Sequence, residues 1–133
     1  MITGGKIAYV EARKESEDPA QGLNINIGLD EINCEGRNVN IKYTYVASYL
    51  GDTESKRVGY LKINGSITAE EDAKTVKEVS EKWKAEKILP PKFAELVLTT
   101  INYTCGSNGT LVVRPLNLSP PMIPPKIELT AKQ

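Results

Sequence analysis

The chain has 133 residues, of which 40% are hydrophobic and 26% charged, as expected for one soluble globular domain. Its 17 basic side chains balance 17 acidic ones, which argues against a general nucleic-acid binder because such proteins carry a basic excess. The chain has no histidine, so catalysis by an imidazole base and metal sites built on histidine are excluded. The spacing of Cys34 and Cys105 fits no zinc or redox motif. We expect both to be small buried hydrophobes, with a reactive thiol as the alternative.

No apolar run approaches the roughly 18 residues that a membrane span requires. The start of the chain also lacks the cationic and then apolar pattern of a signal peptide. We therefore expect a cytoplasmic protein with reduced thiols and no membrane span. Asn-x-Ser/Thr triplets begin at Asn64, Asn102, Asn108 and Asn117, and in that compartment they are chance matches rather than glycan acceptors.

The first half of the chain predicts four antiparallel strands. Residues 6–14 form a plausible first strand, with Ile7 and Tyr9 on one face, and a charged loop follows at 15–21. Apolar and polar residues then alternate in three further stretches, the pattern of half-buried strands. These stretches are 23–29, 39–49 and 58–67. Because short turns join them, neighbouring strands are antiparallel, and one face of the sheet needs a cover.

Two helices are predicted as that cover. Thr68 and Glu71 fit a capping box, and a narrow apolar stripe follows on an otherwise charged helix that ends before Pro90. The stripe consists of Ala73, Val76, Val79 and Trp83. A second helix begins near Pro91 and ends at Gly106 or Gly109. Its apolar positions are Phe93, Leu96, Val97, Thr100, Ile101 and Thr104.

Residues 110–133 are predicted to form an extended C-terminal segment. Five of the eight prolines lie between 110 and 126, which rules out a helix or a central strand there. The segment is also apolar, so it either lies along the body of the protein or binds a partner.

The sequence offers no convincing catalytic machinery. Its serines and threonines have no adjacent base, and the neighbouring Asp30 and Glu31 point to opposite faces of a strand. The acidic residues at 70–72 complement the dipole of the helix that follows, and Gly4-Gly5 lacks the rest of a phosphate loop. We therefore predict no enzyme, no catalytic residue, no metal site and no cofactor.

Four tyrosines fall on adjacent predicted strands: Tyr43, Tyr45, Tyr49 and Tyr60. A tyrosine has an apolar body and a polar tip, which suits a surface that is sometimes wet and sometimes covered. One interpretation places them in the core or at the edge of a twisted sheet. The other makes them walls of a groove for an extended polypeptide.

Three stretches of the chain, in this order, are similar to the SecB protein-export chaperone family. Residues 38–51 (NVNIKYTYVASYLG) resemble the family's second meander strand, and residues 58–67 (VGYLKINGSI) resemble the next one. Residues 96–120 resemble the long helix followed by Leu-Asn-Leu-x-Pro, here Leu116 to Pro120. The resemblance covers residues 6–125.

This resemblance implies a single α+β domain in which a four-stranded antiparallel sheet carries helices on one face. It also implies a chaperone that captures unfolded polypeptides in an apolar groove without ATP. The expected groove walls are Tyr43, Tyr45, Val58, Tyr60, Leu116, Leu118, Met122 and Ile123. Homodimers or tetramers are expected through Phe93, Leu96, Val97, Thr100, Ile101 and Thr104.

The chain also departs from the family pattern. The family's second helix is mostly missing, and no Cys/His tail is present, so zinc-dependent docking to the SecA motor is not expected. The alternative function is a dedicated interaction subunit for one partner, such as an antitoxin, for which SecB-like chaperones of toxin–antitoxin pairs are the family precedent.

Overall fold

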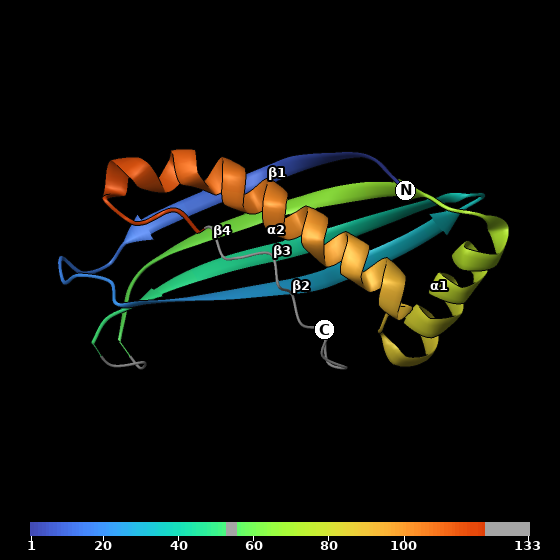
Figure 1. The fold of residues 1–133 in the computed structure, drawn as a ribbon, viewed down its shortest axis with the longest axis horizontal. Helices are drawn as coiled ribbons and strands as arrows, with labels where there is room; N and C mark the ends of the chain where they lie inside the picture. Colours follow the sequence, from blue (N-terminus) through green and yellow to red (C-terminus); the bar gives the residue numbers. More distant parts are fainter. Residues whose placement is uncertain (53–55, 122–133) are drawn as a thin grey trace.

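A computed structural model describes residues 1–52 and 56–121 of the chain. Four strands are followed by two helices and a short 3-10 turn (Figure 1). They are β1 (Ile2–Lys14), β2 (Gly22–Glu35), β3 (Asn38–Leu50), β4 (Arg57–Glu70), α1 (Ala73–Glu86), α2 (Pro91–Val113) and η1 (Arg114–Leu116). The strands form one antiparallel sheet in the order β1-β4-β3-β2. The predicted α+β fold is confirmed.

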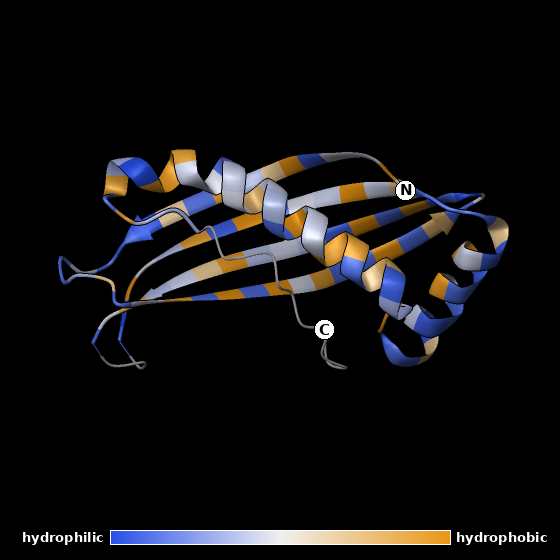
Figure 2. Cartoon of the chain, in the orientation of Figure 1, coloured by the Kyte–Doolittle hydropathy of each residue, from blue (hydrophilic) through white to orange (hydrophobic). Residues whose placement is uncertain are grey.

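The two faces of the sheet differ in polarity because side chains alternate along each strand. Figure 2 shows this alternation along β2, β3 and β4. On β3 every second residue from Val39 to Tyr49 is buried, and the residues between them are exposed or partly exposed. The ladder pairs Tyr43 with Gly65 and Tyr45 with Ile63, so the buried rows of neighbouring strands share the face that α2 covers.

Strand β1 begins earlier than predicted, at Ile2, because the first residues of the chain pair with the end of β4. A bulge between Ile7 and Tyr9 shifts the alternation. Ile7 and Val10 therefore lie on the helix-bearing face, and the predicted pairing of Ile7 with Tyr9 on one face is wrong. A second bulge lies in β2, between Leu29 and Glu31.

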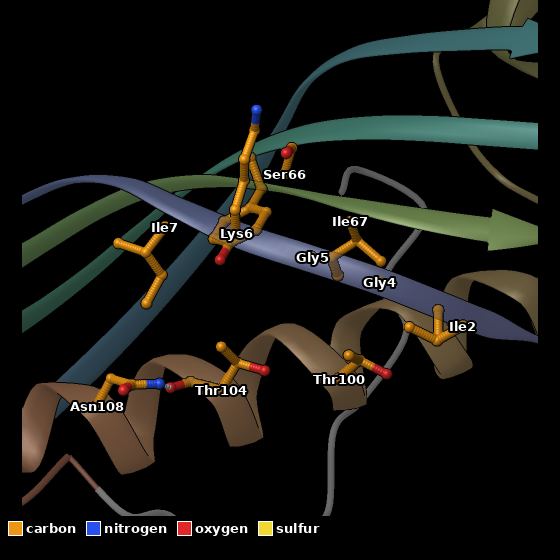
Figure 3. A pocket seen from close by; sticks show the side chains of 11 residues that line it. Ile2, Gly4, Gly5, Lys6, Ile7, Ser66, Ile67, Thr100, Thr104 and Asn108 are labelled. Carbon is orange, nitrogen blue, oxygen red and sulfur yellow. Dashed lines mark hydrogen bonds between the residues drawn. The ribbon is translucent and has the colours of Figure 1, made fainter.

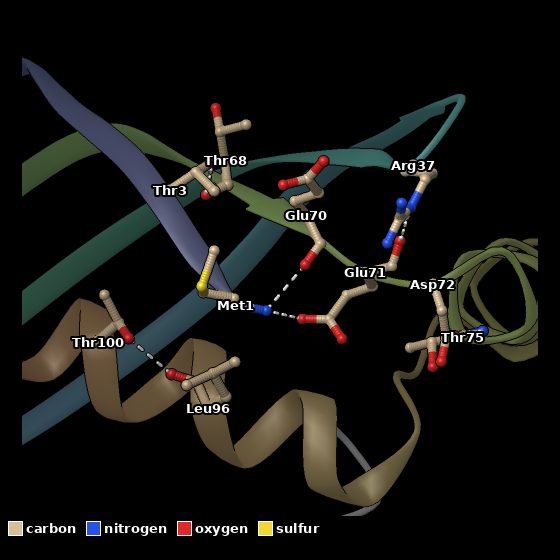
Figure 4. Close-up of polar contacts among 10 residues, drawn as sticks. All are labelled: Met1, Thr3, Arg37, Thr68, Glu70, Glu71, Asp72, Thr75, Leu96 and Thr100. Carbon is tan, nitrogen blue, oxygen red and sulfur yellow. Dashed lines mark hydrogen bonds and ion pairs between the residues drawn. The ribbon is translucent and has the colours of Figure 1, made fainter.

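Helix α1 begins at a different cap from the one predicted. Thr68 belongs to β4, and its hydroxyl donates to Asn40 Oδ1 at 2.7 Å. The N-cap is Asp72, whose carboxylate accepts from the backbone N–H of Thr75 at 2.8 Å. Glu71 binds the N-terminal ammonium group instead of closing a capping box (Figure 4). The strand continues past the predicted cap because its backbone still has partners in β1 and β3.

Helix α2 passes both glycines at which it was predicted to end. Gly106 and Gly109 are buried inside the helix, and Leu61 lies where a side chain on Gly109 would be. Gly109 is thus explained by close packing of helix on sheet rather than by helix termination. The helical region continues through η1 to Leu116, so residues 110–116 are not extended as predicted.

Candidate binding surfaces beside helix α2

Helix α2 crosses the sheet diagonally, from the end of β2 near α1 to the far end of β1 (Figure 1). Its buried face includes Phe93, Val97, Ile101 and Cys105. Because one diagonal helix cannot cover four strands, the first halves of β1 and β2 lie on opposite sides of it. These two regions are the candidate binding surfaces.

The first surface is a cavity between α2 and the start of β1, here called the β1 groove. It has a volume of about 330 Å³. Thr100, Thr104 and Asn108 form its helical wall (Figure 3). The strands contribute Ile2, Gly4, Gly5, Lys6, Ile7, Tyr43, Ser66 and Ile67. Small residues at Gly4 and Gly5 leave room there.

Two polar side chains of the β1 groove donate hydrogen bonds to the backbone of their own helix. The Thr100 hydroxyl donates to the carbonyl of Leu96 at 2.8 Å, and the Asn108 amide donates to the carbonyl of Thr104 at 2.8 Å. Burial raises the pKa of the Tyr43 hydroxyl above its usual value, so that group stays protonated. The Lys6 ammonium points away from α2 (Figure 3). The groove therefore offers shape rather than acid–base chemistry.

The second surface is a row of apolar side chains on the helix-bearing face of β2, here called the β2 row. It consists of Leu23, Ile25, Ile27 and Leu29. All four are only half-buried, whereas their cross-strand partners from Tyr43 to Tyr49 on β3 are buried. β2 has a single neighbour in the sheet, so its outer backbone edge is unpaired among the described residues.

Buried tyrosines lie beside the β2 row. Tyr45, the cross-strand partner of Ile27, is fully buried, and its hydroxyl has no hydrogen-bond partner among the described residues. Burial raises the pKa of Tyr49 to about 12, and the Tyr49 hydroxyl donates to the carbonyl of Ser119 at 2.5 Å. That bond ties the end of the described chain to β3.

The predicted groove walls do not form one open groove in the single chain. Tyr43, Tyr45 and Val58 are 2%, 0% and 1% exposed. Leu118 is buried and Leu116 partly buried, while Met122 and Ile123 lie outside the described residues. The contact of these side chains with a bound polypeptide stays a prediction.

Tyr60 lies on the opposite, polar face of the sheet. Its hydroxyl and that of Tyr9 both donate to the carboxylate of Glu11, and these bonds hold the pKa of Glu11 below its usual value. The Arg57 guanidinium lies 4.5 Å from the centre of the Tyr60 ring. Tyr60 therefore belongs to a surface network apart from the other three tyrosines.

The residues predicted to form an oligomer interface also occupy different environments in the structure. Phe93, Val97 and Ile101 pack against the chain's own sheet, and Thr100 and Thr104 line the β1 groove. Leu96 is exposed, as are two apolar residues of α2 that the prediction omitted, Tyr103 and Leu111. Their helical spacing, at 96, 103 and 111, is the signal that could have identified them.

The described residues hold no group of three or more potential metal-ligating side chains. None of the described helices is long and apolar enough to cross a bilayer.

Comparison with known proteins finds a similarity of fold but none of sequence. No protein-family model matches the chain, and no curated protein is similar enough in sequence to match. A similar solved structure is the Mycobacterium tuberculosis SecB-like chaperone Rv1957, in complex with a ChAD peptide from the Rv1956 HigA1 antitoxin. The TM-score is 0.53 at 12% sequence identity, over 90% of this chain and 85% of that one. The chain therefore has a SecB-like fold.

Proposed function

We propose that this protein is a chaperone that binds non-native polypeptides without ATP, with the β2 row as the contact surface. The observation that carries the proposal is the alternation of four half-buried apolar side chains beside a strand edge that no other described strand pairs with. An extended client with apolar residues at every second position matches that spacing. The SecB-like fold supports the proposal.

Two physical effects would hold such a client. Covering apolar surface contributes roughly 25 cal/mol per Å², and a client strand that pairs with the edge of β2 adds backbone hydrogen bonds. Neither effect depends on the amino-acid sequence of the client, apart from the alternation of apolar residues. We therefore propose broad recognition of unfolded chains, with no bond made or broken and no cofactor.

The test replaces Ile25 and Ile27 with threonine, which keeps strand propensity while removing apolar area. The matched control replaces Asn24 and Asn26 with threonine on the opposite face. Wild type and control should suppress aggregation of a refolding client at near-stoichiometric amounts, and I25T/I27T should require at least about tenfold more protein. Circular dichroism verifies that both variants fold. Absence of suppression by wild type, or equal suppression by I25T/I27T, would contradict the proposal.

A second candidate function is dedicated binding of one partner, such as an antitoxin. The similar chaperone was solved with an antitoxin peptide, which favours this candidate. Pull-down from the native host distinguishes the two, because one abundant partner supports dedicated binding and a broad set of unfolded proteins supports general binding.

We also propose that the protein forms homodimers or tetramers through α2. The exposed Leu96, Tyr103 and Leu111 would be covered in such an assembly, while Phe93, Val97 and Ile101 would support the helix from within. Light scattering after size exclusion measures the mass, and a monomer at micromolar concentration would contradict this proposal.

A further inference from the structure

A cavity opens where the end of β2 meets helix α1, and it is here called the α1 pocket. It has a volume of about 220 Å³. Beyond the bulge the inward residues of β2 are Ile32 and Cys34, which pair with the buried Ile41 and Val39 of β3. Both are half-buried, and α1 lies beside this end of the strand (Figure 1). The lining residues are Ile32, Asn33, Cys34, Ser80, Trp83 and Lys84.

The α1 pocket is open because the helix presents a small side chain to the strand. Val76 and Val79 are the buried residues of α1, and Ser80 and Trp83 follow them on the same side at helical spacing. The serine side chain is short, so the space that a larger residue would fill stays open beside the Trp83 ring. An apolar cavity of about 150 Å³ holds a benzene molecule. The α1 pocket therefore has room for the side chain of one phenylalanine.

The walls of the α1 pocket combine apolar surface with positive charge. Ile32 and Trp83 supply apolar surface, and burial raises the pKa of the Cys34 thiol, so that group is neutral. Lys84 is the charged residue of the lining, and it forms no ion pair within the part of the chain that the structure describes. The Lys87 ammonium lies 5.2 Å from the centre of the Trp83 ring. A carboxylate next to an aromatic side chain would complement this arrangement.

An acidic residue of β2 lies near the α1 pocket, but on the polar face of the sheet. Glu31 is the cross-strand partner of the exposed Lys42. Its carboxylate accepts a hydrogen bond from the Asn33 amide at 2.7 Å and lies 4.0 Å from the Lys42 ammonium. The negative charge of Glu31 is therefore already paired, and Lys84 determines the charge of the pocket.

The α1 pocket continues the β2 row. Leu29 ends the row, and Ile32 follows three positions later, roughly 10 Å along the strand. A client that pairs with the outer edge of β2 in the antiparallel sense, the more stable arrangement, has its first paired residue near Leu29. The bulge between Leu29 and Glu31 interrupts the alternation there. Client residues that precede the paired segment therefore leave the strand edge beside the α1 pocket.

We infer that the α1 pocket binds an aromatic side chain of the client, with a neighbouring client carboxylate against Lys84. The inference rests on the proposed function, which it deepens into a preference for an acidic–aromatic pair before an alternating apolar segment. The client ring gains contact with the Trp83 ring. The carboxylate adds a smaller contribution that salt screens, because Lys84 is exposed.

Occupancy is tested first with a ligand too short to use the β2 row. Acetyl-Asp-Phe-amide at millimolar concentration should slow the alkylation of Cys34 by iodoacetamide at least about threefold, whereas acetyl-Asn-Ala-amide should not. The same protection is expected in I25T/I27T. Lys84→Glu should reduce the ratio of the rates without and with the dipeptide. The control Lys77→Glu, at an exposed position of α1 outside the pocket, should preserve it. Equal alkylation of wild type with and without Asp-Phe would overturn the inference.

The preference is then measured with two fluorescent decapeptides. Acetyl-Asp-Phe and acetyl-Asn-Ala each precede the same eight residues of alternating leucine and serine, with fluorescein at the C-terminus. Wild type should bind the Asp-Phe peptide at least about tenfold more tightly. Ser80→Leu fills the pocket and should bind the two peptides within about twofold of each other. The control Glu78→Leu, at an exposed position of α1, should keep the tenfold preference. Circular dichroism verifies folding, and equal affinity of wild type for both peptides would overturn the inference.

The two proposals fail in different ways. Protection of Cys34 by the dipeptide, without binding of either decapeptide, supports the α1 pocket and overturns the chaperone function. Equal binding of both decapeptides that is lost in I25T/I27T, with Cys34 unprotected by the dipeptide, supports the chaperone function and overturns the α1 pocket.

Discussion

Replacing Gly65 with alanine should destabilise the protein, because the space beside this residue is already filled. A Cβ atom there would lie 2.6 Å from the hydroxyl oxygen of Tyr43 and 2.6 Å from the carbonyl oxygen of Lys6. The Lys6 oxygen belongs to the backbone of β1, and Tyr43 is buried with its hydroxyl 3.7 Å from Cys105 Sγ. Neither atom can move without disturbing its own packing.

The expected loss is about 1–2 kcal/mol. Overpacking of a filled core costs about 1–3 kcal/mol, and the smaller conformational freedom of alanine in the unfolded chain offsets about 0.4–1 kcal/mol. For a chain of this size each kcal/mol corresponds to roughly 3–5 °C, so the melting temperature should fall by about 3–10 °C.

Thermal unfolding followed by circular dichroism measures this change. Gly4→Ala is the matched control, since a Cβ atom there has nothing within 4 Å, and its melting temperature should equal or exceed that of wild type. Tyr43→Phe removes one of the two close oxygens, so Gly65→Ala should cost less in that background. A melting temperature of Gly65→Ala within about 1 °C of wild type would refute the reasoning.

Two further predictions follow from buried groups. Because burial raises the pKa of Tyr49 to about 12, and also raises those of Tyr43 and Tyr45, the unfolded chain ionises first. The free energy of unfolding should therefore be constant from about pH 7 to about pH 10 and fall as the pH rises towards 12. Urea titrations at each pH measure it, and a flat profile would count against this. Burial also raises the pKa of Cys105 to about 11, so iodoacetamide at pH 8 should modify half-buried Cys34 first and Cys105 only on unfolding. Equal rates by mass spectrometry would contradict that.

The order and type of the elements could be predicted from the sequence because their patterns are local. Alternation from Leu23, Val39 and Val58 identified three strands, and helical spacing identified both helices. Element ends depended on distant partners. Gly109 was expected to stop α2, but its role is set by Leu61, 48 positions earlier in the chain. Thr68 fits a cap by spacing, yet β3 pairs with it in the sheet.

The candidate site was harder to predict because exposure depends on where α2 crosses the sheet. Alternation assigns Ile27 and Tyr45 equally to an inner face, but the structure buries Tyr45 and leaves Ile27 half-buried. No local sequence pattern determines the direction in which a helix crosses a sheet. The sequence therefore left the tyrosines open between core residues and groove walls, and it did not distinguish the exposure of the β2 row from that of the other strands.

The bulge between Leu29 and Glu31 limits how long a strand can pair with β2 while its side chains keep the same alternation between the two faces. From Gly22 to Leu29 the register with β3 is uninterrupted, a footprint of about eight residues or some 27 Å. Beyond the bulge the inward positions change parity, so the side chains of a longer ligand would turn the wrong way. For peptides that pair along this edge, affinity should therefore increase with peptide length up to about eight residues and then stop increasing.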